Sequence, residues 1–135
     1  MQREVFLGAG RLLTLATPIP LTALISRVKA HLGLPHVRLA IPPGESTPTI
    51  TTIAVCAGSG ASVLLGVEAD CYLAGEMSHH DVLEAVSTGT AVILTEHSNT
   101  ERGYLQVFKQ KLENSLGAGV EVTVSKVDRD PIQVA

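Results

Sequence analysis

The stretch Thr90-Ala91-Val92-Ile93-Leu94-Thr95 decides the fold, because it is a short and continuous apolar run that follows Gly89. An apolar run of this length without alternation is typical of a strand that is buried on both faces of a sheet. Residues 49–56 are rich in Ile, Val and Thr and predict another strand, and residues 70–74 predict a shorter one. These three runs predict a sheet with a buried middle.

Helical patterns separate the predicted strands. Residues 21–32 place apolar side chains at steps of three and four after Pro20, and Gly33 ends this helix. Ser78 is expected to cap a second helix that ends at Gly89, with Asp81 as the reciprocal acid three residues later. The other expected elements are helices over 61–67 and 100–116 and strands over 10–15, 36–41 and 120–127.

Strands that alternate with helices predict an α/β layered domain with a mixed, largely parallel sheet flanked by helices. The 135 residues suffice for one domain with its own core, and neither a repeat nor a linker divides them. We therefore expect residues 1–135 to form a single α/β domain. Residues 128–135 are expected to be a tail, because Pro131 would interrupt sheet pairing there.

Composition excludes some classes of function. The net charge is −3 and no basic block is present, which argues against direct nucleic-acid binding. No apolar stretch is long enough to span a membrane, and the amino terminus lacks a secretory signal pattern. Cys56 and Cys71 follow apolar residues and are expected to be buried free thiols in a reducing cell. These features predict a soluble protein of the cytoplasm.

His97 and Glu101 are the first candidate site residues. They lie four apart where the last apolar strand gives way to a helix, so the imidazole and the carboxylate can point at one place. Such a pair suits two metal ligands, or a base with its orienting partner. The alternative is that His97 caps the strand and Glu101 only favours the positive end of its helix.

Glu76, His79 and His80 occupy the equivalent place after the preceding strand. Glu76 can act as a general base or orient a ligand, and adjacent histidines point in different directions on a helix. The alternative is an acid near a helix start and two surface histidines. Ligands gather beyond the carboxyl ends of strands in open α/β sheets, so the two clusters predict one site.

A third loop, Gly58-Ser59-Gly60, is predicted to follow a strand and open a helix. Its backbone N–H groups could hold an anion, although it is neither a Walker loop nor a full dinucleotide fingerprint. The alternative is a tight turn whose glycines let a helix pack close to the sheet.

These motifs resemble a known family. Residues 70–80 and 96–103 are similar to the carboxy-terminal signature of the NGG-interacting-factor-three-like proteins, which are also labelled type 2 GTP cyclohydrolase I. Residues 56–60 match the family's strand-to-helix loop, and residues 8–13 resemble the segment that opens its carboxy-terminal part. The resemblance is strongest with animal members, in which Glu stands in Gly-Glu-Met-Ser-His-His.

The resemblance implies a two-metal site between two α/β lobes, with His97 and Glu101 as metal ligands and Glu76 and His80 beside the site. Nothing in this chain corresponds to the family's amino-terminal lobe, which carries a His-His motif and further ligands including an Asp. The chain therefore resembles one lobe of a two-lobe fold. The ligand types suit divalent ions such as Zn, Fe or Mn, completed by ligands from the missing lobe.

Three hypotheses about function follow. The first is a half-site of a dinuclear, metal-dependent hydrolase of unknown substrate, in which Glu76 or His80 moves protons. The second is a module that forms a homo-oligomer or binds a transcription-related protein partner, as the family name implies. The third is a nucleotide-binding domain built on the loop at Gly58, Ser59 and Gly60.

Overall fold

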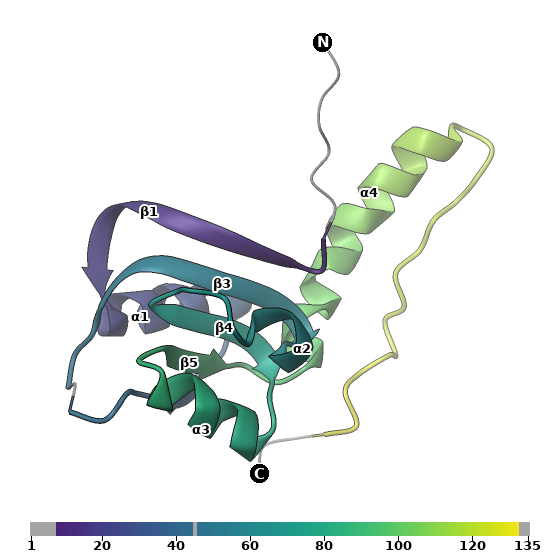
Figure 1. Ribbon diagram of the computed structural model, residues 1–135. Coiled ribbons are helices and arrows are strands. Elements are labelled where there is room, and N and C mark those ends of the chain that lie inside the picture. The colour runs from purple at the N-terminus through teal and green to yellow at the C-terminus, as the bar shows by residue number, and fades with distance from the viewer. Residues whose placement is uncertain (1–7, 45, 133–135) are drawn as a thin grey trace. The chain divides into compact units, whose positions relative to one another are not determined.

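A five-stranded sheet in the order β1-β3-β4-β5-β2 organises the chain up to Thr100 (Figure 1). This computed structural model describes residues 8–44 and 46–132. The strands are β1 (Gly10–Pro20), β2 (Arg38–Ala40), β3 (Thr49–Ser59), β4 (Cys71–Glu76) and β5 (Ala91–Leu94). The helices of this part are α1 (Leu21–Leu32), α2 (Ala61–Leu64) and α3 (His79–Ser87).

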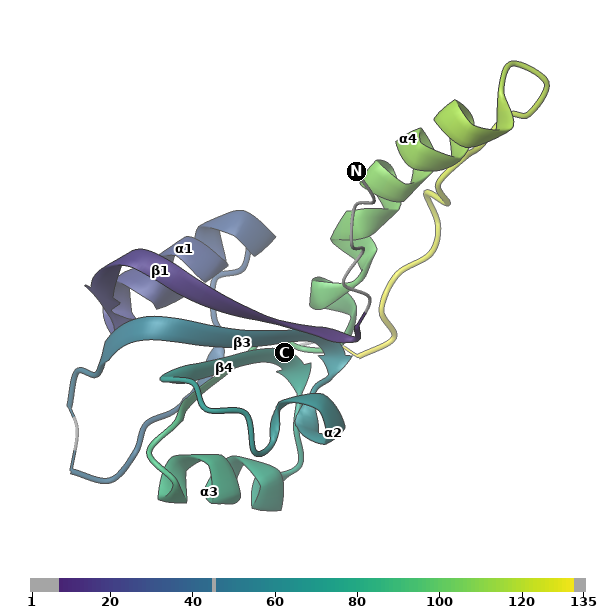
Figure 2. The same ribbon diagram turned by 45° about the horizontal axis from the view of Figure 1, so that its top comes forward.

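The sheet is mixed, as the sequence predicts. The three middle strands β3, β4 and β5 run parallel, whereas the two edge strands β1 and β2 pair antiparallel with β3 and β5. Helix α1 lies on one face of the sheet, and α2 and α3 lie on the other face (Figure 2). The parallel middle therefore has both faces covered, which is the usual condition for parallel strands.

The two faces of the sheet are filled by alternating side chains of the same strands. Ile53, Cys71 and Ile93 join the core under α1, and their neighbours in sequence join the core under α2 and α3. Those neighbours are Ala54, Tyr72 and Val92. Because successive strand residues point to opposite faces, a continuous apolar run supplies both cores at once.

Two predicted helices are confirmed with their end signals. Helix α1 begins after Pro20, and Gly33 ends it in the left-handed conformation at φ 67°. Helix α3 begins at a complete capping box, in which the Asp81 backbone N–H donates to Ser78 Oγ over 3.3 Å. In return the Ser78 backbone N–H donates to Asp81 Oδ2 over 3.1 Å. These local signals act within a few residues, so the sequence shows them directly.

Several boundaries differ from the prediction. Strand β1 continues past residue 15, because edge strands tolerate Pro18 and Pro20 around a register shift between Thr14 and Ile19. Strand β3 likewise continues to Ser59, since Gly58 forms an irregularity at φ 66° inside the strand. The glycines and prolines of both strands thus mark irregular pairing rather than strand ends.

Three further elements are shorter than predicted. Strand β2 is limited to Arg38–Ala40, and α2 is a single turn that ends at Leu64. Residues 98–104 form two 3-10 turns, so the helix expected from residue 100 begins only at Leu105. Gly103 lies in this irregular stretch, where glycine is a poor helix former.

Asp70 fixes the entry to β4. Its Oδ2 accepts hydrogen bonds from the backbone N–H of Thr51 over 2.7 Å and of Thr52 over 2.8 Å, and from the Thr52 hydroxyl over 3.0 Å. Burial raises the pKa of this carboxyl, but the bonds from Thr51 and Thr52 outweigh it and leave the pKa below its ordinary value. The ionised carboxyl therefore stabilises the link between the beginning of β4 and the beginning of β3.

Residues from Glu101 on form a second compact unit, which is described by itself. It contains a 3-10 turn at Arg102–Tyr104 and the helix α4 (Leu105–Leu116). The Arg102 guanidinium donates to both carboxylate oxygens of Asp128, over 2.8 and 3.4 Å, which holds the start of the predicted tail. Residues 133–135 of that tail lie outside the described residues, and the single domain over residues 1–135 stays a prediction.

The strand predicted over residues 120–127 is wrong, because this segment is an extended coil (Figure 1). Its Val residues alternate with polar residues as in a half-buried strand, but it has no strand pairing within the described part of its unit. Among the described residues, the longest apolar helices fall short of the length and hydropathy that crossing a membrane requires.

Candidate functional site at the carboxyl ends of the parallel strands

The three loops that the sequence singles out meet at one edge of the sheet. Ser59 at the end of β3 pairs with Glu76 at the end of β4, and the Gly60 N–H donates to the Glu76 carbonyl over 3.1 Å. The Gly58 N–H donates to Thr100 Oγ1 over 2.7 Å, which ties β3 to the segment after β5. The predicted convergence is therefore confirmed up to Thr100, because parallel strands end at the same edge.

Glu76 and His97 form the central polar pair of this edge. His97 Nδ1 lies 2.8 Å from Glu76 Oε1, and both side chains are about half exposed, at 45% and 44%. An ionised carboxylate only accepts hydrogen bonds, so Nδ1 carries the hydrogen and donates it. In the neutral imidazole the lone pair then belongs to Nε2, and the carboxylate fixes the orientation of the ring.

Close packing against β4 positions His97. A side chain at Gly75 would place its Cβ 2.8 Å from the His97 Cα and 2.8 Å from the Gly58 carbonyl oxygen. Only glycine leaves room for the loop to lie directly on the end of β4. The Thr100 hydroxyl then donates to the His97 carbonyl over 2.7 Å within the 3-10 turn Ser98–Thr100. The ring of His97 therefore emerges from a closely held backbone.

Glu96, just before His97, has an unusual backbone conformation. Its φ is 69°, and it is the one non-glycine residue with positive φ among residues 8–44 and 46–132. The left-handed conformation costs a residue with a Cβ about 1–2 kcal/mol. Arg38 Nε lies 3.0 Å from Glu96 Oε1, although an ion pair this exposed contributes only about 0.2–1 kcal/mol. Arg38 is not evident as a site residue from the sequence, because no local motif links β2 to this turn.

The glycine loop after β3 is largely occupied by contacts within the protein. The N–H groups of Gly58 and Gly60 donate to Thr100 Oγ1 and to the Glu76 carbonyl oxygen. A Cβ at Gly60 would lie 2.6 Å from the Ala74 Cβ, so this glycine allows α2 to pack close to the sheet. The anion-binding role of Gly58, Ser59 and Gly60 stays a prediction, with two of its three amides already donating.

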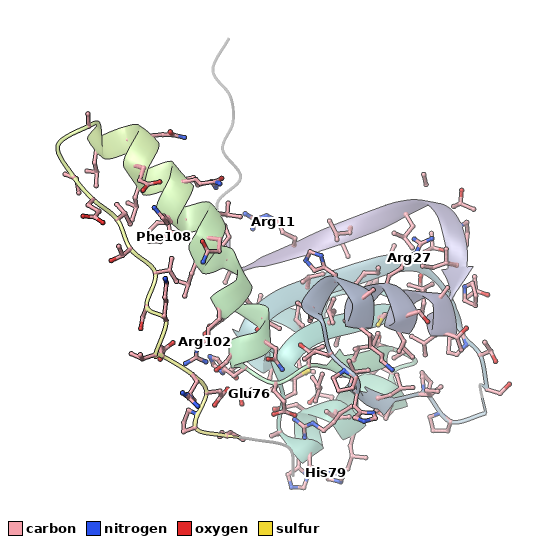
Figure 3. The ribbon with its side chains drawn as sticks, turned by 180° about the vertical axis from the view of Figure 1, so that it is seen from behind. Arg11, Arg27, Glu76, His79, Arg102 and Phe108 are labelled. Atoms are coloured by element: carbon pink, nitrogen blue, oxygen red, sulfur yellow. The ribbon has the colours of Figure 1, made fainter. Side chains whose placement is uncertain are left out.

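The remaining predicted site residues, His79, His80 and Glu101, take no part in the hydrogen bond between Glu76 and His97. His79 and His80 are exposed on the first turn of α3, with their rings edge to face and 6.2 Å between centroids. Figure 3 shows His79 on the outer side of α3, pointing away from Glu76. Glu101 begins the second unit, where its carbonyl accepts from the Tyr104 N–H over 3.0 Å. Its pairing with His97 as a metal ligand therefore stays a prediction.

The donor set fits part of a metal site. An imidazole whose Nδ1 is held by a carboxylate is the usual form of a metal-binding histidine. Within the described stretches, however, no group of three or more His, Cys, Asp or Glu residues is placed to hold an ion. The described residues alone therefore do not complete a coordination sphere, which takes at least three or four ligands.

An α/β lobe with a polar pair, here Glu76 and His97, beyond the ends of its parallel strands is found in a known protein family. The family model Duf34/NIF3 (NGG1p interacting factor 3) matches residues 4–131, and the chain is a member of this family. It is 52% identical over 128 residues to the human NIF3-like protein 1, covering 94% of this chain and 34% of that protein. The chain thus spans about a third of the length of this curated relative.

Two other comparisons extend the family. The yeast protein named NGG1-interacting factor 3, from Saccharomyces cerevisiae, is 44% identical over an alignment of 140 positions, which covers 99% of this chain and 48% of that protein. The crystal structure of the Staphylococcus aureus protein SA1388 matches this chain with a TM-score of 0.71 at 27% identity. The match covers 93% of this chain and 37% of the SA1388 chain. The expected resemblance and the α/β fold are therefore confirmed.

Proposed function

We propose that this chain supplies one half of a divalent-metal site in a metal-dependent hydrolase. The observation that supports the proposal is the hydrogen bond of 2.8 Å between His97 Nδ1 and Glu76 Oε1. It places the imidazole lone pair on Nε2, the atom that would coordinate an ion such as Zn, Fe or Mn. When bound, such an ion would polarise the substrate and lower the pKa of a water molecule.

In this proposal Glu101 is the second ligand, and the remaining ligands come from the rest of the protein. The spacing of four residues from His97 is the reason for choosing Glu101, and the chain covers only 34% of its human relative. Glu76 holds the His97 ring, so its carboxylate is engaged as an acceptor. His80 is then the remaining candidate for moving a proton, on the exposed first turn of α3.

Metal content measured by mass spectrometry tests this proposal. The measurement uses this chain and a version extended by the other lobe of a family-length protein. We expect metal in the extended version, its loss with His97→Ala, and a reduced affinity of about 10–100-fold with Glu76→Gln. His79→Ala is the matched control, since this exposed histidine points away from the site. Full metal content in the His97→Ala variant would sink the proposal.

A second candidate function is protein interaction. Helix α4 exposes large apolar side chains within its own unit, and the yeast relative is named for interacting with NGG1. They are Leu105, Val107, Phe108 and Leu116, with exposures of 39–54%. We propose that this surface serves a homo-oligomer or a transcription-related partner, which would place the protein in the nucleus as well as the cytoplasm.

Light scattering tests the homo-oligomer with matched variants of α4. Phe108→Glu is expected to turn an oligomer into a monomer, whereas Gln106→Glu adds the same charge at an exposed polar position and is expected to change nothing. A wild-type chain that is monomeric at all concentrations would remove the homo-oligomer, and the transcription-related partner would then be tested with purified NGG1-like protein.

A further inference from the structure

The turn that carries His97 contains one residue that needs support. Glu96 has a φ of 69°, a conformation that glycine adopts readily and glutamate does not. The residue before it is fixed, because Thr95 is buried and its N–H donates to the Ala74 carbonyl over 3.1 Å. The residue after it is fixed as well, since the His97 carbonyl accepts from Thr100. The left-handed turn at Glu96 thus lies between two residues, Thr95 and His97, whose backbone groups are held by hydrogen bonds.

Arg38 is the side chain that holds Glu96. It pairs in register with Leu94, two residues before Glu96, and its Nε lies 3.0 Å from Glu96 Oε1. Edge strand β2 has only three residues, and the position beside the end of β5 is taken by this arginine. The planar guanidinium of Arg38 places a positive charge beside the Glu96 carboxylate.

We propose that Arg38 and Glu96 are a positioning pair for His97. By holding the Glu96 carboxylate, Arg38 stabilises the left-handed turn after β5, and this turn brings the His97 ring to Glu76. The role rests on the proposed function insofar as His97 is the metal ligand. The positioning itself is a property of the metal-free chain and is tested there.

A direct role for Arg38 in binding an anion is the competing interpretation. Arg38 also lines a cavity of about 190 Å³, together with Met77, His79 and Val92. If the guanidinium contacts a substrate there, its removal would weaken anion binding whatever residue stands at position 96. If Arg38 acts through the turn, its removal would matter only when residue 96 has a Cβ.

The His97 tautomer, read by nitrogen NMR of the labelled 135-residue chain without metal, separates the two interpretations. Spectra are recorded where the imidazole is neutral, and His97 is assigned by comparison with His97→Ala. We expect the Nδ1–H form in the wild type and a shift to a mixture of tautomers in Arg38→Met, which keeps the aliphatic stem. Arg38→Lys is expected to show a smaller shift than Arg38→Met, because lysine keeps the positive charge but not the forked guanidinium.

The decisive variant is Arg38→Met combined with Glu96→Gly. Glycine accepts a φ of 69° without cost, so the double variant is expected to return to the wild-type tautomer. Arg27→Met, at an exposed arginine on α1, is the matched control and is expected to show no shift. Backbone amide spectra verify that each variant is folded.

Two results would overturn the positioning role: an unchanged tautomer in Arg38→Met, or the same shift with and without Glu96→Gly. A shift that inorganic phosphate alters equally in both backgrounds would establish the anion contact instead. The outcome is independent of metal content, so positioning can fail while the metal site holds, and the metal site can fail while positioning holds.

Discussion

Strand β5 and residues 120–127 both have strand-like sequences, yet only one of them forms a strand. In β5 the four residues Ala91–Leu94 are between 0% and 5% exposed, and they pair with β4 on one side and β2 on the other. In the second segment Val120 is 48% and Val127 is 81% exposed, and the backbone is coil. The difference lies in the neighbours that each segment finds.

A strand-like sequence pattern is not sufficient to form a strand. Alternation or a continuous apolar run states which side chains could be buried, whereas a strand needs partners for its backbone groups as well. β5 has helices over both faces and strands on both sides, so its pattern and its environment agree. The segment 120–127 has the pattern alone, and the described part of its unit contains the helix α4 and a 3-10 turn but no strand.

The largest expected effect is the loss of core packing in β5. Ile93→Ala removes a side chain that is 0% exposed, and we expect it to lower the free energy of unfolding by about 2–5 kcal/mol. The matched change Val122→Ala, in the segment that lacks pairing, is expected to cost less than about 0.5 kcal/mol. Urea denaturation followed by circular dichroism measures both. Equal losses would contradict the contrast between the two segments.

A smaller effect is expected from adding one methyl group at a glycine. Gly75→Ala places a Cβ 2.8 Å from two backbone atoms, and overpacking of this kind costs about 1–3 kcal/mol. Gly119→Ala is the control, because no atom lies within 4 Å of the added Cβ in the described residues. Thermal unfolding should show a lower midpoint for Gly75→Ala and no decrease for Gly119→Ala. A tolerated Gly75→Ala would mean that the loop bearing His97 can move away from β4.

Much of the first unit follows from local sequence signals. The capping box at Ser78, the left-handed Gly33 and the apolar run at residues 91–94 each act over a few residues. The site was harder to predict, because the sequence suggests partners only by their spacing along the chain. That spacing pairs His97 with Glu101, four residues away. The hydrogen bond with Glu76 joins residues 21 apart, and it depends on the register between β4 and β5.

A third prediction compares two carboxylates, one in each unit. Burial raises the pKa of Asp70, but hydrogen bonds from Thr51 and Thr52 leave it below its ordinary value, and the hydrogen bonds from Arg102 lower the pKa of Asp128. A lowered folded-state pKa contributes stability above the unfolded value of about 3.9 and loses it as the pH falls through the folded value. Asp70→Asn should therefore destabilise the chain at pH 7 by about 1–2 kcal/mol, and by less at pH 3.

Asp128→Asn is the control for that prediction. Its carboxylate is exposed, so salt screens the interaction with Arg102 and the substitution should leave the unfolding midpoint nearly unchanged at high salt. Urea denaturation at pH 7 and pH 3 compares the two variants. The prediction fails if Asp70→Asn costs as much at pH 3 as at pH 7, because the loss would then not depend on the charge.

The smallest expected effect is the sharpest test of the unpaired segment. Thr123→Pro removes a backbone N–H in the middle of residues 120–127, and proline in a paired strand removes a ladder hydrogen bond. Because this segment is coil, we expect a change within about 0.5 kcal/mol in the free energy of unfolding and no added amide exchange elsewhere. A decrease in the free energy of unfolding well above that value would show that residues 120–127 pair with a strand in solution. The alternating sequence of this segment would then form a strand with paired backbone groups, as β5 does.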